Sequence, residues 1–333
     1  SSAASDVYKR QARLLRALDP ETPLTVLVTT SERRADEIGR ALAAFAGERP
    51  LRTLILPPWD CLPYDRASPS RESMGRRMAV FEQLTRDAAG SVVLVSSPDA
   101  LMQRIPPRAV LAERFEIETG APLDRDALSA FAHRAGYVQD DRIDEPGEIA
   151  ILGEVVDVYP PSSAAPLRIA IDEDGRVADI RRYDPVTQRS DDSVERLCLT
   201  PASELLIGPE DVRTPGEEHR MAERYSGGLE SLLDLLSGAC ILTEDEVEDR
   251  CRRFADQTAE AHQTRLAFRD EDARPLPPEQ SYLSLEETLA FLDQGQRLDL
   301  DGLSGNPSFA VERSPGKALA SFIQERRDAG RRV

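Results

Sequence analysis

In the first third of the chain, short continuous apolar runs alternate with segments whose apolar residues have helical spacing. Three short runs rich in branched residues, at 24–29, 51–56 and 92–96, are typical of strands buried on both faces of a parallel sheet. The segments 31–45 and 71–86 lie between these runs and carry apolar residues at helical spacing. Because strands and helices alternate, this region is predicted to form an α/β domain with a parallel sheet.

The pattern changes after Pro106 and Pro107, where the predicted elements become shorter. The Asp-Gly pair in DEDG at 172–175 is a hairpin signal between two short alternating strands. The expected elements are a strand at 109–117, a helix at 124–135 and strands near 148–159, 167–172 and 176–183. This mixture predicts a compact α+β domain inserted into the α/β domain.

The first pattern returns after Pro201. A helix is predicted at 228–236, and the run ACILT at 239–243 is typical of a further strand of the first sheet. A long charged helix is expected at about 244–268, and a proline-rich loop at 269–281.

The two ends of the sequence look different from the rest. Residues 1–11, SSAASDVYKRQ, look like a translated sequencing adapter, and we exclude them from the fold prediction. The basic end at 326–333 looks like the approach to another strand, so we expect an internal fragment of a longer protein. The predicted division is 12–110 for the first part of the α/β lobe, 111–203 for the inserted domain, 204–268 for the second part of the lobe, and 269–333 for a linker and the start of a further domain.

The charge of the chain limits the partners that it can bind. Hydrophobic residues make up 40% and charged residues 31% of the 333 residues, so a packed core is expected. The net charge is −18, and residues 115–200 hold 19 acidic and 9 basic side chains. Since binding to a duplex requires Lys and Arg near the phosphates, strong DNA binding by this chain is not expected. A protein partner with a basic surface fits the charge better.

Cysteine usage and hydropathy indicate a cytoplasmic protein. The four cysteines have no C-x-x-C spacing and few histidines near them, which favours reduced thiols and argues against a zinc site. No apolar run approaches the roughly 18 residues that span a bilayer, so we expect no membrane contact.

The sequence offers no convincing catalytic, cofactor-binding or metal-binding residue. A Walker A motif is absent. Glu244 and Asp245 follow a predicted strand and imitate a Walker B pair, but an acidic first turn of a helix is the favoured interpretation. His133, His219 and His262 have no nucleophile nearby in the sequence, and we expect surface or structural histidines.

The only tryptophan lies in a proline-rich segment, PPWDCLPYD at 57–65. Trp59 is either an aromatic binding residue or a buried anchor of a stiff loop, and we favour the anchor. Asp60 and Asp65 are then expected to cap turns or backbone amides.

Five blocks of residues occur in a recognisable order over about 56–204. The blocks are Trp59-Asp60 with Leu62 to Asp65, Ser97-Pro98 with Leu101 to Arg104, Gly136-Tyr137 through to Asp157–Pro160, Arg168 with Ile180 to Asp184, and Pro201-Ala202 with Glu204. Together they resemble the amino-terminal UvrB-like module of bacterial transcription-repair coupling factors, the Mfd family. UvrB itself is less similar, because its long tyrosine-rich hairpin is replaced here by the short segment 59–70.

The resemblance implies a fold and a set of partners. The fold would be a degenerate helicase-like (P-loop type) parallel-sheet domain without activity, carrying an inserted α+β domain that docks onto the damage-recognition ATPase UvrA. The module would also restrain the translocase motor domains of the same parent chain. ATP and Mg would serve the full-length parent, whose other domains would contact RNA polymerase and DNA.

The resemblance also points to five candidate partner-binding residues. Leu152 stands where the family has an arginine, and Asp172 stands where it has an exposed phenylalanine. Losing such residues from an interface costs roughly 2 kcal/mol or more each. Arg168 is retained, and Arg181 or Arg182 is expected to assist it.

Three functional hypotheses follow from the sequence. The leading one is a non-catalytic fragment that recruits UvrA in transcription-coupled nucleotide excision repair. A second is a P-loop ATPase or UvrB-like helicase subunit truncated before its Walker A motif, since the suspected adapter occupies the place of that loop. A third is an acidic interaction module with no role in repair.

Overall fold

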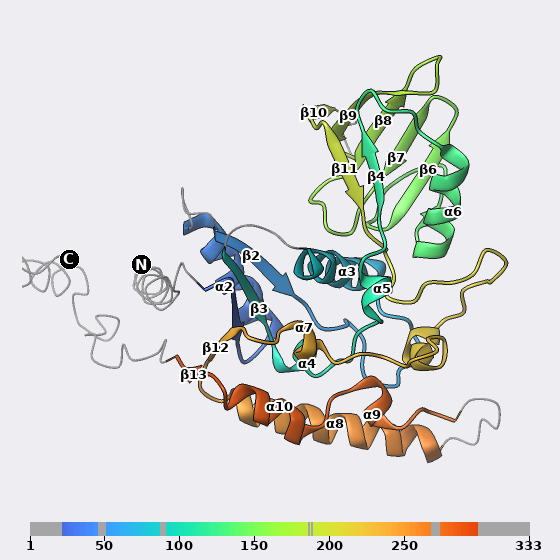
Figure 1. Ribbon diagram of the computed structural model, residues 1–333. Helices are drawn as coiled ribbons and strands as arrows, with labels where there is room; N and C mark the ends of the chain where they lie inside the picture. Colours follow the sequence, from blue (N-terminus) through green and yellow to red (C-terminus); the bar gives the residue numbers. More distant parts are fainter. Residues whose placement is uncertain are drawn as a thin grey trace, which may run out of the picture.

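The computed structural model describes residues 22–45, 51–86, 91–185, 187, 189–267 and 274–298. Its first sheet has five parallel strands in the order β13-β12-β1-β3-β2 (Figure 1). The strands are β1 (Leu24–Val28), β2 (Leu51–Leu56), β3 (Ser91–Ser96), β12 (Cys240–Thr243) and β13 (Gln296–Arg297). The predicted parallel sheet is therefore confirmed, including the return of the chain to it at β12.

Each face of this sheet is covered by helices, because alternate strand residues point to opposite sides. On one face, Leu27, Val95 and Leu242 pack with residues of α2 (Glu32–Phe45). On the other face, strand residues including Val26 and Val28 pack with residues of α3 (Arg71–Thr85) and α8 (Val247–Ala267). Both faces are buried, which explains the nearly continuous apolar runs in the strands.

Short helices complete the α/β lobe. They are α4 (Pro98–Leu101), α5 (Arg108–Leu111), α7 (Leu232–Leu235), α9 (Pro278–Ser281) and α10 (Leu285–Leu292), with a 3-10 helix at Glu217–Glu223. Figure 1 shows α8, α9 and α10 on the side of the molecule opposite the inserted domain. Among the described helices, none is long and apolar enough to cross a membrane.

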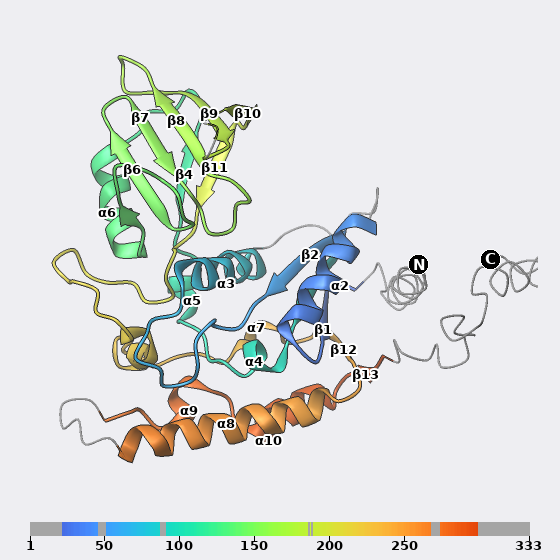
Figure 2. The ribbon, with the colours of Figure 1, turned by 180° about the vertical axis from the view of Figure 1, so that it is seen from behind.

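The inserted domain has a six-stranded sheet in the order β10-β9-β8-β7-β6-β5 and a two-stranded sheet of β11 and β4. Apolar residues of helix α6 (Arg125–Ala135), including Leu128 and Phe131, pack on one face of the larger sheet. Figures 1 and 2 show this domain above α3. The strands are β4 (Phe115–Glu118), β5 (Val138–Gln139), β6 (Glu148–Leu152), β7 (Val155–Val158), β8 (Leu167–Ile171), β9 (Val177–Tyr183), β10 (Ser190–Ser193) and β11 (Arg196–Leu199).

Four of the predicted elements need correction. The helix expected at 228–236 is formed only over α7, Leu232–Leu235. The strand expected at 109–117 is wrong in its first part, because Pro107 starts helix α5 and β4 begins only at Phe115. The stretch near 148–159 is two strands, β6 and β7, separated by a turn at Gly153, which has a φ of 55°. The loop expected at 269–281 contains the short helix α9.

A buried ion pair lies where the chain returns from the inserted domain to the lobe. Arg77 of α3 donates from Nε to Glu204 Oε1 at 2.7 Å, and both side chains are 0% exposed. The indole N–H of Trp59 donates to the same oxygen at 2.6 Å. The half-buried Trp59 is thus an anchor, as predicted, and we call Arg77, Glu204 and Trp59 the junction network.

The aspartates near Trp59 also act as predicted. Asp60 accepts the backbone N–H of Ser70 at 2.8 Å, and Asp65 accepts that of Arg66 at 2.6 Å. The four cysteines are free thiols. The suspected adapter at 1–11 and the end at 299–333 lie outside the described residues, and the proposed domain boundaries stay a prediction.

Candidate partner-binding surface

The six-stranded sheet has an outer face, opposite the face that packs on α6. Two cross-strand rows form its centre, running across β6, β7, β8 and β9. The rows are Ala150, Asp157, Arg168 and Arg181, and beside it Leu152, Val155, Ala170 and Asp179. The register thus brings Leu152, Arg168 and Arg181 onto one surface, which the sequence alone did not establish.

Arg168 is held on this outer face by a carboxylate and an aromatic ring. Its Nε and Nη2 donate to the two carboxylate oxygens of Asp157 at 2.8 and 2.7 Å. Its guanidinium carbon lies 4.7 Å from the ring centre of the buried Tyr183. These hydrogen bonds to Asp157 raise the pKa of Arg168 above its ordinary value. The guanidinium is held in one orientation while the side chain stays 36% exposed.

Leu152 gives the outer face an apolar part. It is 51% exposed, and its cross-strand partner on β7 is Val155. The following residue, Gly153, has a positive φ, and a Cβ placed on it would meet nothing within 4 Å. Glycine is therefore required by the backbone conformation of the turn and not by crowding.

Asp172 has a structural role in the turn between β8 and β9. Its carboxylate accepts the backbone N–H groups of Asp174 at 3.0 Å and Arg176 at 2.8 Å. Gly175 follows with a φ of 75°. Asp172 therefore caps the hairpin that DEDG predicted, and this is a physical reason for aspartate at a place where the resembling family has phenylalanine.

The two candidate arginines of β9 are separated by the alternation of the strand. Arg181 is the cross-strand partner of Arg168 and forms an ion pair with Asp179. Arg182 is the cross-strand partner of the buried Leu167, so it points to the other side of the sheet. Arg181, and not Arg182, belongs to the outer face.

Sequence reasoning missed Asp157 and Tyr183 as the residues that orient Arg168. Asp157 lies between the buried Val156 and Val158. The alternation of polar and apolar residues along β7 therefore indicates that its side chain points outward. Its pairing with Arg168 depends on the register of β7 and β8, which no local pattern supplies.

A sequence model of the UvrB interaction domain family matches residues 115–205. These residues form a UvrB interaction domain. Its family match covers both outer-face rows and extends to Glu204 of the junction network.

Over much of its length the chain is similar to transcription-repair-coupling factors. The factor of Haemophilus influenzae is 32% identical over 55% of this chain, and that of Myxococcus xanthus is 32% identical over 60%. The factor of Rickettsia bellii is 23% identical over 90% of the chain. These alignments cover 15%, 17% and 29% of the three relatives, so the chain spans less than a third of their length.

Outside the UvrB interaction domain, the Walker B-like acid has a structural partner. Glu244 follows β12 directly and is buried, and Arg34 of α2 donates to it at 2.5 to 3.0 Å. Helix α8 begins three residues later, at Val247. Glu244 and Asp245 therefore precede the helix, and the expectation that they form its acidic first turn is wrong, because that turn holds Glu248 and Asp249. Glu244 instead ties the end of β12 to α2.

The histidines lie where surface or structural residues were expected. His133 is exposed on α6, and His262 packs against the Tyr64 ring. His219 is buried, contacts Trp59 edge-on and has Nε2 at 3.1 Å from the carbonyl of Ala67. Since a carbonyl only accepts, Nε2 carries the proton, and burial lowers the pKa of His219 below 6.5.

Proposed function

We propose that the outer face of the UvrB interaction domain binds UvrA, so that the chain recruits UvrA in transcription-coupled nucleotide excision repair. The family match over residues 115–205 is the observation that carries the proposal. The relatives' name, transcription-repair-coupling factor, supports the coupling part of it.

The geometry of Arg168 supports its role as the central contact. Ordering a flexible arginine on binding costs about 0.5–1.5 kcal/mol, and Asp157 and Tyr183 reduce that cost by holding the guanidinium in advance. Leu152 adds exposed apolar surface beside it, next to the half-buried Val155. An apolar patch next to an oriented arginine is a common composition for the core of an interface.

The α/β lobe is proposed to be a degenerate helicase-like lobe without ATPase activity. The ion pair between Glu244 and Arg34 supports this, because a carboxylate bound by arginine is a poor ligand for a magnesium ion. In this proposal, ATP and Mg act in other parts of a longer parent protein, and the lobe restrains the motor domains of that parent. RNA polymerase and DNA are also contacted by those parts.

The test is a calorimetric titration of the full chain with purified UvrA. Micromolar or tighter binding is expected for the wild-type chain. Arg168→Ala is expected to weaken binding by roughly 2 kcal/mol, about 30-fold, because a central oriented arginine is removed. Arg196→Ala is the matched control, since Arg196 lies on β11 of the same domain and forms a surface ion pair with Glu118.

Two outcomes contradict the proposal. One is no detectable UvrA binding by a chain whose circular dichroism shows that it is folded. The other is an equal loss of affinity in Arg168→Ala and Arg196→Ala, which would mean that overall charge and not the outer face determines binding.

A further inference from the structure

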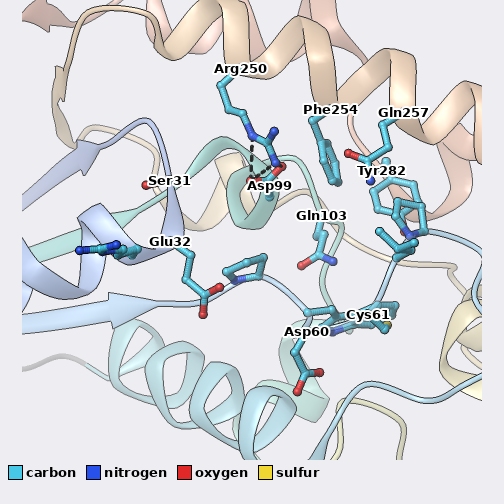
Figure 3. Close-up of a pocket in the computed structure, with 15 residues that line it drawn as sticks. Ser31, Glu32, Asp60, Cys61, Asp99, Gln103, Arg250, Phe254, Gln257 and Tyr282 are labelled. Carbon is cyan, nitrogen blue, oxygen red and sulfur yellow. Dashed lines mark hydrogen bonds and ion pairs between the residues drawn. The ribbon is translucent and has the colours of Figure 1, made fainter.

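A cavity of about 410 Å³ lies at the carboxyl ends of β1, β2 and β3, far from the outer face in the sequence and on a different domain (Figure 3). The segment 58–63, which follows β2, forms one wall, and helix α8 forms another. In open α/β sheets, ligands bind in the crevice outside the carboxyl ends of the strands. The position of this cavity is therefore typical of a ligand-binding site.

The charges around the cavity do not balance. Asp99 and Arg250 neutralise each other through an ion pair of 2.7 Å, drawn as dashed lines in Figure 3. The carboxylate of Glu32 makes no hydrogen bond or ion pair with another described residue, and that of Asp60 accepts only a backbone N–H. Arg33 also lines the cavity but is paired with Glu37, and Arg76 acts on Glu32 without an ion pair between them, so neither Glu32 nor Asp60 has an ion-pair partner among the described residues.

Burial and the surrounding acids both act on Glu32. Burial raises the pKa of Glu32, and the negative charges of Asp36, Asp60 and Asp99 raise it further, while Arg76 acts in the opposite direction. A site that resists the ionisation of its own carboxyl group is a site where a bound cation is stabilised.

A second observation comes from Gln103. Its side chain points into the cavity in Figure 3, and the residue is only 6% exposed. Its Oε1 has no hydrogen-bond partner among the described residues. Leaving a buried acceptor unpaired costs about 1–3 kcal/mol, so the structure gains if a ligand supplies a donor there.

The apolar part of the lining favours a planar ligand. Phe254 and Tyr282 are both buried to more than nine-tenths, and Figure 3 shows their rings beside the cavity. A guanidinium group stacks on aromatic faces and presents several N–H donors in one plane, whereas an ammonium group is compact and strongly hydrated.

We propose that this cavity binds a guanidinium group, with Glu32 as the counter-ion, Gln103 as a hydrogen-bond acceptor and the aromatic pair of Phe254 and Tyr282, whose ring planes are inclined at 71° to each other, beside it. The group belongs either to a free small molecule or to an arginine side chain of a protein. This site is separate from the proposed UvrA surface and does not depend on it.

The experiment uses the full chain and the fluorescence of Trp59, which is the only tryptophan and lines the cavity. Agmatine and a blocked arginine, N-acetyl-arginine-N-methylamide, are titrated and followed by Trp59 emission and calorimetry. The blocked citrulline of the same shape is the neutral control. Saturable binding of a guanidinium compound is expected, with the citrulline compound at least ten-fold weaker.

Variants of the cavity make the test specific. Glu32→Gln is expected to weaken binding at least ten-fold, and Gln103→Leu is expected to weaken it about three-fold. Glu286→Gln is the control, because Glu286 is an exposed carboxylate of α10 that does not line the cavity. It should bind as the wild-type chain does.

The pattern of binding also identifies the source of the group. Binding of agmatine but not of the blocked arginine supports a free small molecule, and binding of both supports an arginine side chain. The proposal is overturned if neither compound binds, if the citrulline compound binds equally well, or if Glu32→Gln leaves the affinity unchanged.

Discussion

Two arginine–carboxylate pairs of this protein have similar geometry and very different surroundings. In the junction network, Arg77 and Glu204 are both 0% exposed. On the outer face, Arg168 and Asp157 are 36% and 16% exposed. The first pair lies beside the boundary of the inserted domain and is inaccessible to a partner, whereas the second leaves an oriented cation at the surface. A charged residue that matches the family pattern is therefore a candidate for partner binding only if its side chain is exposed.

The largest difference is expected when one partner of each pair is removed. Glu204→Ala leaves the charge of Arg77 buried and unpaired, and it should lower the free energy of unfolding by about 3–5 kcal/mol. Asp157→Ala should cost no more than about 1 kcal/mol, because the exposed side chain of Arg168 can be solvated instead. Urea denaturation followed by far-ultraviolet circular dichroism measures both.

The control for this test removes both charges of the junction. The double variant Arg77→Met, Glu204→Leu should recover more than half of the lost stability, since no unpaired buried charge remains. Equal losses in Glu204→Ala and Asp157→Ala would show that the two pairs do not differ as their burial indicates.

A second test adds a cation to the outer face. Leu152→Arg should strengthen UvrA binding by about 2 kcal/mol, because Leu152 is 51% exposed in the row next to Arg168. Leu152→Lys should give less than half of that gain, since an ammonium group lacks the planar fork of arginine. An equal gain for both, measured by calorimetry, would indicate general electrostatic attraction.

A smaller effect on UvrA affinity is expected when Arg168 is kept but the hydrogen bonds that orient it are weakened. Asp157→Asn keeps the arginine but weakens the hydrogen bonds that orient it, so UvrA affinity should fall by about 1 kcal/mol, roughly five-fold. Arg182 points to the other side of the sheet, so Arg182→Ala should leave the affinity for UvrA unchanged. A loss in Arg182→Ala larger than that in Asp157→Asn would place the contact elsewhere.

The smallest effect concerns His219, which packs on Trp59 beside the junction network. The pKa of His219 is lower in the folded chain than in the unfolded chain. At pH values between the folded-state pKa and 6.5, the unfolded chain therefore binds more protons. The stability contributed by the neutral imidazole is complete above pH 6.5 and decreases as the pH falls below it.

The measurement compares the free energy of unfolding at pH 7.5 and pH 5.5. His219→Gln should lose less stability over this interval than the wild-type chain. His133→Gln, which changes an exposed histidine of α6, should behave as the wild-type chain does. Identical pH dependence in all three chains would contradict the role assigned to the buried imidazole.

The sequence was most informative where local patterns decide the structure. The apolar runs at 24–29, 51–56 and 92–96 predicted β1, β2 and β3 to within a residue at each end. DEDG predicted the β8–β9 turn because Asp-Gly suits its backbone geometry. The strand expected at 109–117 was wrong because a proline-initiated helical turn, RAVL, has the same apolar content as a strand.

The candidate surface was predictable only in part. Arg168 was named from the sequence as a contact residue, but Asp157 and Tyr183 were not identified as its partners, because cross-strand register decides which side chains meet. The pair of Arg77 and Glu204 joins residues 127 positions apart, and no periodicity indicates such a contact. Glu204 was recognised only as part of a resembling block, and its burial supplies the physical reason for a carboxylate there.

The most direct test of the central claim maps the UvrA contact without relying on energies. A photo-reactive phenylalanine analogue is placed at Leu152, on the outer face, and separately at Val212, which is 82% exposed elsewhere on the molecule. After irradiation with purified UvrA, a covalent product is expected from position 152 and not from position 212. A product from position 212 alone, or equal yields from both, would contradict the account.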